Sequence, residues 1–177
     1  MIDDYDLTNL GKEAKRRTNS KAKGSRFERK IATMFNNRFE TTEFSRTPGS
    51  GAFATTHSLP EYLKIYGDLI APKNFKYCIE CKKGYKNIKI NNLLDYSSQL
   101  YKFIKQCEKD SKKCNKEPML IIQQDRQPIL AIIRGKKYYQ TTKSMIEPTQ
   151  NVKFGEYKMV LFESILEAWA QGDWFTG

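Results

Sequence analysis

Two carboxylates and a lysine lie in an otherwise apolar stretch of the chain, GDLIAPKNFKYCIECKKG at positions 67–84. Asp68 begins one apolar run, and Glu80 and Lys82 belong to the next. Residues two apart on a strand point to the same face, so Glu80 and Lys82 are expected side by side. Buried charges are kept where they are paired or bind a ligand. The stretch is therefore the first place to look for chemistry.

The two runs, 68–72 and 75–82, predict an antiparallel hairpin that turns at 72–74. With the turn centred on Asn74, Asp68 lies opposite Glu80 and Tyr66 lies opposite Lys82. Directly opposed Cβ atoms are about 4.5–5.5 Å apart, so the two carboxylates could share a ligand. A slip of one residue would break this register.

Two buried carboxylates at this separation repel each other, which favours a positive partner between them. A hard divalent cation, Mg²⁺ or Mn²⁺, suits carboxylate oxygens and is often shared with substrate phosphates. Such an ion would polarise a phosphate and lower the pKa of a bound water, while Lys82 could orient that water or stabilise developing charge. The alternative is a structural ion network of Asp68, Lys82 and Glu80.

The overall charge indicates a polyanionic partner. The chain has 31 Lys and Arg against 20 Asp and Glu, a formal net charge of +11. Basic residues gather at 11–30, 82–89 and 102–116, and this clustering favours a phosphate-binding surface over charge that serves solubility alone. The predicted DNA contacts in the first two clusters are Arg16, Arg17, Lys23, Arg26, Lys83 and Lys86.

The length of 177 residues, with 39% hydrophobic and 29% charged residues, is typical of one globular domain. We expect a flexible basic arm at 1–19 and a single domain at 20–177. No apolar run is long enough to span a membrane, and the N-terminus has no signal-peptide core, so a cytoplasmic location is expected.

The cysteine spacing Cys78-x-x-Cys81 invites a zinc interpretation. Residues three apart on a strand point to opposite faces, however, so the two thiols cannot easily hold one metal. We expect all four cysteines to be reduced and mostly buried.

Apolar periodicity predicts the elements around this stretch. A helix from Ser20 has an apolar stripe, a strand covers 41–46, and a Pro- and Gly-rich loop follows. Asn91 is expected to cap a helix over 92–110, a second hairpin covers 118–134 with its turn at 125–127, and a strand and a helix end the chain.

The expected inward residues are Phe27, Ile31, Met34 and Phe35 in the first helix, Leu94, Leu100, Phe103 and Ile104 in the second, and Phe162, Ile165, Leu166 and Trp169 in the last. The segment 59–65 is ambiguous. The order predicts an α/β fold with one mixed sheet flanked by helices.

A family resemblance adds to this interpretation. Gly67-Asp68, eleven intervening residues and then Glu80-Cys81-Lys82 resemble the bipartite motif of the PD-(D/E)XK nuclease superfamily, with Gly where Pro is frequent. The stretches GSRFERKIATMF and FSRTPGSGAF resemble the first helix and the following loop of archaeal-type Holliday junction resolvases. The long insert at 51–67, the N-terminal arm and the C-terminal tail depart from that pattern.

The resemblance implies a restriction-endonuclease-like fold, phosphodiester hydrolysis and a homodimer. It implies that Glu28, Asp68 and Glu80, with the Cys81 carbonyl, hold the metal and that Lys82 is the catalytic lysine. It also implies that Ser50 is an active-site residue near the DNA backbone and that Arg46 contacts phosphate.

Other residues are weaker candidates. His57, the only histidine, is a possible general base, although a loop histidine is more often a surface residue. Gln99 matches a glutamine that faces the site in many relatives, and a solvated role is equally open. Tyr85, Tyr96 and Tyr101 could touch DNA, although packing in the core or at its rim is the safer assumption.

Three functions follow. The first is a metal-dependent endonuclease that resolves four-way DNA junctions, which fits a small phage recombination or packaging enzyme acting in the host cytoplasm. The second keeps the chemistry but cuts duplex DNA, as restriction and homing enzymes do. The third is a noncatalytic DNA-binding module, against which the complete set of Glu28, Asp68, Glu80 and Lys82 argues.

Overall fold

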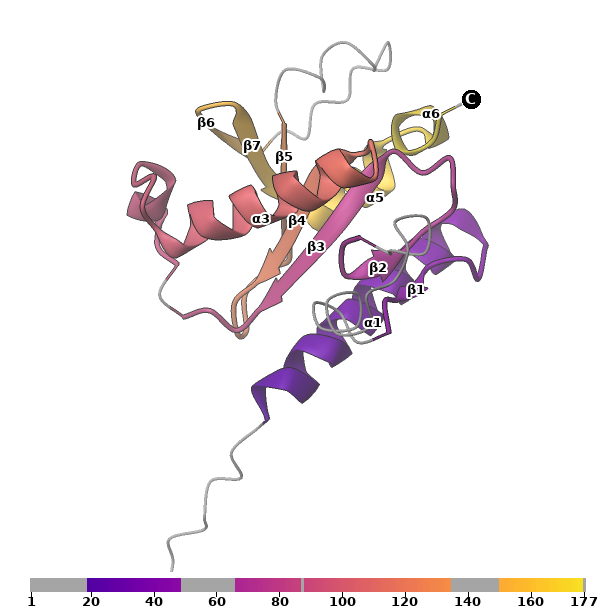
Figure 1. Ribbon diagram of the computed structural model, residues 1–177, viewed down its shortest axis with the longest axis horizontal. Helices are drawn as coiled ribbons and strands as arrows, with labels where there is room; N and C mark the ends of the chain where they lie inside the picture. The colour runs from indigo at the N-terminus through magenta and orange to yellow at the C-terminus, as the bar shows by residue number, and fades with distance from the viewer. Residues whose placement is uncertain (1–18, 49–65, 87, 135–149, 177) are drawn as a thin grey trace, which may run out of the picture.

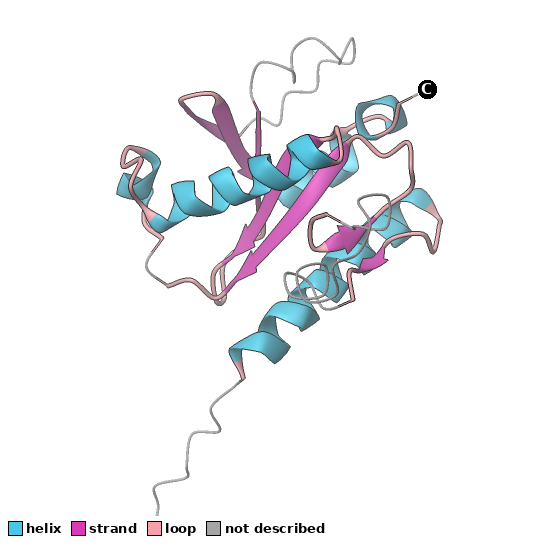
Figure 2. Cartoon of the chain, viewed as in Figure 1, coloured by secondary structure: helices cyan, strands magenta, loops and turns pink. Residues whose placement is uncertain are grey.

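The computed structural model describes residues 19–48, 66–86, 88–134 and 150–176. Figures 1 and 2 show the arrangement of these residues: a central sheet with α3 across one face and other helices on the opposite side. Most of the predicted N-terminal arm, the loop with Ser50 and His57, and the ambiguous segment 59–65 lie outside the described residues.

Helix α1 (Ser20–Phe39) follows from local signals. The Asn19 side chain accepts a hydrogen bond from the Lys21 N–H at 3.0 Å and caps the first turn. Phe27, Ile31 and Phe35 are buried and Met34 is half-buried against the same cluster, which confirms the predicted stripe. The helix ends at Glu40, which has a left-handed backbone conformation.

The main sheet has five strands in the order β3–β4–β5–β7–β6. Strands β3 (Tyr77–Lys83) and β4 (Glu117–Gln123) are parallel, and the remaining neighbours, β5 (Leu130–Arg134), β7 (Tyr157–Leu161) and β6 (Asn151–Phe154), are antiparallel. The parallel pair needs a crossover, which is provided by the short 3₁₀ helix η3 (Ile90–Leu93) and α3 (Gln99–Lys113). The mixed α/β sheet and the β4–β5 hairpin were both predicted.

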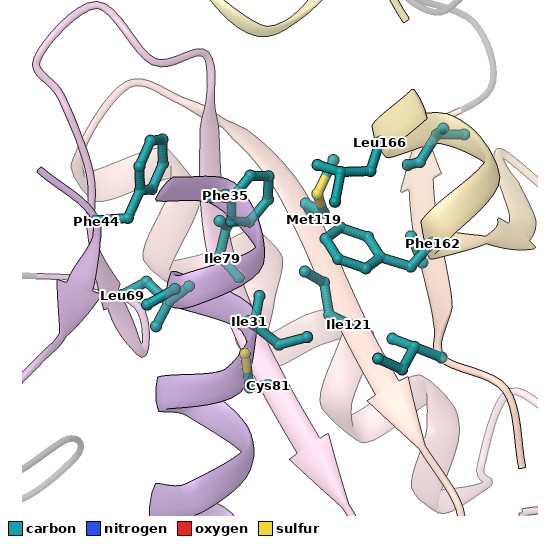
Figure 3. Packing of buried hydrophobic residues seen from close by; sticks show 14 of the residues in the cluster. Ile31, Phe35, Phe44, Leu69, Ile79, Cys81, Met119, Ile121, Phe162 and Leu166 are labelled. Atoms are coloured by element: carbon teal, nitrogen blue, oxygen red, sulfur yellow. The ribbon is translucent and has the colours of Figure 1, made fainter. Parts of the chain in front are cut away.

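The sheet buries apolar residues on both faces. One cluster joins α1 and α5 (Phe162–Ala168) to the sheet, and Figure 3 shows Ile31 and Phe35 of α1 packed beside Ile79, Met119 and Phe162. The other lies beneath α3 and includes Leu100, Phe103 and Ile104. In the first cluster, α6 (Gln171–Trp174) adds the fully buried Trp174. The inward stripe predicted for the last helix is confirmed, since all four of its residues are buried.

The predicted helix over 92–110 is wrong at its start. Ser98, not Asn91, is the N-cap of α3, and its hydroxyl accepts from the Tyr101 N–H. Leu94 lies before the helix and is 82% exposed, whereas the other predicted inward residues are buried. The local cap at Ser98 thus starts the helix about two turns later than the apolar spacing alone suggested.

The predicted first hairpin is also wrong as a ladder. Strand β2 (Leu69–Ile70) pairs with β1 (Ser45–Arg46) in a separate two-stranded sheet, in which Arg46 lies opposite Leu69. The partner of β3 is β4, and the Asp68 N–H donates to the Ile79 carbonyl at 2.8 Å, so Asp68 is not in register with Glu80. The strand predicted at 41–46 is limited to its last two residues. In the described parts of the chain, no helix has both the length and the apolar character needed to cross a membrane.

Candidate functional site

Alternate side chains of strand β3 point to opposite faces of the sheet. Ile79 and Cys81 point into the cluster shared with α1, while Lys82 lies with its ammonium 5.0 Å from the ring centre of Phe103 on α3. Glu80 is on the same face as Lys82, is 3% exposed, and forms an ion pair with the Lys82 ammonium. The sequence prediction that Glu80 and Lys82 are side by side is therefore confirmed.

Asp68 reaches β3 by its side chain rather than by strand pairing. Its Oδ2 accepts from the Cys81 N–H at 2.8 Å, next to the backbone bond from its own N–H to Ile79. Its carbonyl accepts from the Thr47 N–H at 2.9 Å. The carboxylate thus takes the place of a backbone acceptor at the free edge of β3, and this fixes it near Glu80.

Gly67 makes this approach possible. Its φ of +81° is in the left-handed region, and a Cβ there would lie 2.7 Å from the Ile79 carbonyl oxygen. The Thr47 hydroxyl donates to the Gly67 carbonyl at 3.1 Å and holds the same turn. Glycine is thus required by both the backbone conformation and the closeness of β3.

Glu28 joins the site from α1. It is 8% exposed, and the Arg46 Nε donates to its Oε2 at 2.5 Å. Its charge raises the pKa of both Asp68 and Glu80, so the three carboxylates form one electrostatic group. Arg46 is thereby engaged with a carboxylate rather than directed freely toward a DNA phosphate.

Burial raises the pKa of two of these carboxylates, Asp68 and Glu80. It raises the pKa of Asp68 to about 7, and the charges of Glu80 and Glu28 add to this, against the Cys81 N–H and Lys82. Burial also raises the pKa of Glu80, although Lys82 opposes it. Burial acts to lower the pKa of Lys82, but the charge and hydrogen bond of Glu80 outweigh it and raise that pKa. Lys82 is therefore charged at neutral pH.

The donor set has the chemistry that a hard cation prefers. Asp68 and Glu80 offer carboxylate oxygens, and the charge of Glu80 raises the pKa of Asp68. The N–H and C=O of one strand residue point to the same edge, so the Cys81 carbonyl faces the side where Asp68 lies. As the described side chains stand, Glu80 is paired with Lys82 and Glu28 with Arg46, and no three His, Cys, Asp or Glu of these residues converge on one ion position. The residues fit a metal in chemistry and would need to release these pairs to bind it.

The predicted DNA contacts have different surroundings. Lys23 and Lys83 gather near Asp125 in the β4–β5 turn, and the charge of Lys86 also acts on Asp125. Arg26 and Lys86 are exposed. Arg16, Arg17, Ser50 and His57 lie outside the described residues.

The weaker candidates also separate. Gln99 is exposed at the first turn of α3, one turn before Phe103. Tyr85 and Tyr96 are 40% and 67% exposed. Tyr101 is buried and its hydroxyl donates to the Leu93 carbonyl at 3.1 Å, so a role in touching DNA is wrong for this residue.

Cys78 and Cys81 lie on opposite faces of β3, as strand alternation predicted. Cys81 belongs to the cluster beside α1, whereas Cys78 is close to Cys107 and Cys114 of the α3 side, with the Cys107 thiol 3.8 Å from the Cys78 carbonyl oxygen. All four cysteines are reduced, and all but the half-buried Cys114 are buried. The spacing therefore does not form a two-thiol metal grip.

Sequence reasoning missed three contributors to this region: Thr47, Phe103 as the ring beneath Lys82, and Asp125. Phe103 was assigned to the core, and nothing local distinguished it from its neighbours. Asp125 was assigned to a turn, and only its distance of 2.5 Å from the Lys23 ammonium reveals its second role.

Comparison with known proteins gives the family. Residues 19–171 match the family described as "Phage putative PDDEXK endonuclease". Protein D14 of Escherichia phage T5 is 32% identical over 151 residues, which cover 81% of this chain and 89% of that protein. No solved structure matches the chain. This match covers most of the chain, and the mixed sheet and the placing of Asp68, Glu80 and Lys82 agree with it. The protein belongs to the phage PDDEXK endonuclease family.

Proposed function

We propose that the protein is a divalent-metal-dependent DNA endonuclease that resolves four-way junctions. One observation carries the catalytic part: the Asp68 carboxylate is tied to the Cys81 N–H beside the buried Glu80–Lys82 ion pair. Burial raises the pKa of both carboxylates and the charge of Glu80 raises that of Asp68 further, so a second cation beside Lys82 would stabilise their ionised forms.

Asp68, Glu80 and the Cys81 carbonyl would hold the cation, Mg²⁺ or Mn²⁺, and Glu28 would complete the set from α1. When bound, the ion would polarise the scissile phosphate and neutralise part of its charge. Glu28 and Glu80 would exchange their pairing with Arg46 and Lys82 for the ion, which leaves both cations close to the phosphate.

Lys82 would act as a charge donor to the reaction rather than as a base. Its pKa is raised by Glu80, so it carries a proton at neutral pH and can hydrogen-bond to the charge that develops on the phosphate. The Phe103 ring below it restricts its direction. Asp68, whose pKa burial raises to about 7, is the group that would take up a proton near neutral pH when no metal ion is bound.

Junction DNA is the substrate that the sequence features favour. The proposal is supported by the first-helix and loop stretches that resemble junction resolvases, and by the net charge of +11 on a chain of this size. A homodimer would present two such sites to the two opposed strands of a junction. The enzyme would act in the cytoplasm of the phage's host.

The test compares a labelled four-way junction with a linear duplex of the same arms, each with Mg²⁺ and with Ca²⁺. Symmetric nicks in the junction, with Mg²⁺ only, are expected. Cutting of the duplex at a fixed sequence would replace the junction proposal by a restriction-like one. Tight binding with no cleavage under either ion or Mn²⁺ would refute the catalytic proposal.

A further inference from the structure

The carboxylate of Asp125 is held by lysines from two distant parts of the chain. The Lys23 ammonium lies 2.5 Å from Oδ1 and donates a hydrogen bond to Oδ2 at 2.6 Å. The Lys83 ammonium lies 4.0 Å from Oδ1. Lys23 is in the first turn of α1, Lys83 ends β3, and Asp125 is in the β4–β5 turn, so three elements meet at this carboxylate.

The backbone is shaped for this meeting. Gly84 has a φ of +87°, and a Cβ there would lie 2.9 Å from the Lys23 ammonium nitrogen and 3.2 Å from its Cε. The Lys23 side chain therefore passes directly over the chain where β3 ends. On the other side, the Gln127 N–H donates to the Gln124 carbonyl at 3.3 Å and Arg126 is left-handed, which closes the tight turn that presents Asp125.

One carboxylate does not neutralise these lysines. Hydrogen bonding by Lys23 lowers the pKa of Asp125, and the charges of Lys23, Lys83 and Lys86 add to this. Burial lowers the pKa of Lys83, and the charges of Lys23 and Lys30 lower it further, although Asp125 opposes them. Three ammonium groups, those of Lys23, Lys83 and Lys86, thus act on the one Asp125 carboxylate, and the cluster keeps an excess of positive charge.

The cluster adjoins the candidate active site. Lys83 directly follows Lys82 on β3 but points to the opposite face, where its ammonium lies 5.7 Å from the ring centre of Phe27 and 2.7 Å from the Gln123 Oε1. Lys82 and Lys83 are consecutive residues whose Cα atoms lie about 3.8 Å apart, so their side chains leave the same end of β3 from its two faces. The Asp125 Oδ1 lies between the Lys23 and Lys83 ammoniums, where a phosphate oxygen would find the same two charges.

We propose that Lys23, Lys83 and Lys86 form a binding site for a DNA backbone phosphate that flanks the scissile one, and that Asp125 occupies this site in the free protein. DNA displaces the carboxylate, and the competition lowers affinity for any DNA that cannot also engage the catalytic site. The inference rests on the proposed function in that DNA is taken as the polyanion. A purely structural pair is the alternative, and exposed ion pairs of this kind contribute little to stability.

The experiment measures binding of the full chain to fluorescent duplex and four-way junction DNA, without divalent metal, over a series of salt concentrations. Asp125→Asn removes the competing charge and keeps the side-chain size. Glu167→Gln is the matched control: it makes the same charge change on α5, beside the carbonyls of Leu166 and Trp169 that accept hydrogen bonds from Arg38. Arg38, which marks the position of Glu167, is fifteen residues from Lys23 on α1, or about 22 Å along the helix. This exceeds the Debye length of about 10 Å, so the charge of Glu167 is screened from the Lys23 cluster.

Asp125→Asn is expected to bind duplex DNA about 3- to 10-fold more tightly at roughly 0.1 M salt, and to steepen the slope of log K against log salt by about one, because one more phosphate contact forms. Glu167→Gln should change affinity less than about 2-fold. Lys23→Gln should weaken binding more in the Asp125→Asn background than in the wild type, where Asp125 already occupies Lys23. An Asp125→Asn variant that remains folded by circular dichroism but binds as the wild type does, or more weakly, overturns the proposal.

The cleavage assay separates this inference from the proposed function. If the wild type cuts no DNA but Asp125→Asn binds more tightly and with a steeper slope, the phosphate site stands and the nuclease proposal fails. If the wild type cuts junctions and Asp125→Asn shows no gain, the nuclease proposal stands and the phosphate site fails.

Discussion

Replacing Asp68 with Asn should stabilise the metal-free protein while it abolishes cleavage. The carboxylate is buried beside Glu80, which raises its pKa from 3.8 to about 7. A pKa difference of this size between the unfolded and folded states means that ionisation of Asp68 lowers the free energy of unfolding by at most about 4 kcal/mol. Asn keeps an oxygen that can accept from the Cys81 N–H and removes the charge. Because Asp68 and Glu80 share the repulsion, we expect a gain of about 2 kcal/mol at pH 8.

The gain in stability from Asp68→Asn should grow as the pH rises. Below the ordinary pKa of 3.8, Asp68 is protonated in both folded and unfolded protein, so Asp68→Asn should have little effect. As the pH rises toward about 7, only the unfolded state loses its proton, so the wild type loses stability and the variant does not. Above that pH the difference should be constant.

The assay is denaturant unfolding in EDTA at a series of pH values, with m-values compared to verify a two-state transition. Asp95→Asn is the control, because hydrogen bonds from Ser97 lower the pKa of Asp95 and removing this carboxylate should not stabilise the fold. Mg²⁺ at ten times its Kd should stabilise the wild type by about 1.4 kcal/mol and leave Asp68→Asn unchanged. An Asp68→Asn variant that is less stable than the wild type at pH 8, or a difference that does not vary with pH, would refute this account.

Three further predictions test single contacts. Lys82→Gln should abolish cleavage and cost about 3 kcal/mol in metal-free unfolding, because it leaves the Glu80 carboxylate buried without its partner; unchanged stability would mean that Glu80 is already protonated. Gly67→Ala should cost roughly 2 kcal/mol or more, since its Cβ would lie 2.7 Å from the Ile79 carbonyl oxygen at a left-handed φ, whereas Gly172→Ala, with no atom within 4 Å, should be neutral or stabilising in the same thermal melts. Phe103→Leu should leave the fold intact but reduce kcat more than DNA affinity, because the ring holds Lys82 in position; an unchanged kcat would assign Phe103 to the core alone.

Local periodicity determined much of this protein. The stripe of α1, the shared face of Glu80 and Lys82 and the opposite faces of Cys78 and Cys81 all follow from the repeat of a helix or a strand. The β4–β5 hairpin was equally predictable, since its two apolar runs are separated by a short polar turn. These features depend on neighbours within a few residues, and the printed sequence contains those neighbours.

Only the tertiary structure decided how the candidate site is assembled. The first hairpin was expected to bring Asp68 opposite Glu80, but β2 pairs with β1, and Asp68 instead reaches β3 through a side-chain bond to the Cys81 N–H. The pairing of Asp125 with Lys23, residues far apart in the chain, had no local signal at all. A strand carries unpaired donors and acceptors on both edges, and its sequence does not say which segment will satisfy them. The sequence by itself determined which faces of α1 and β3 most of their side chains take, and packing of the whole chain decided which residues from distant segments meet.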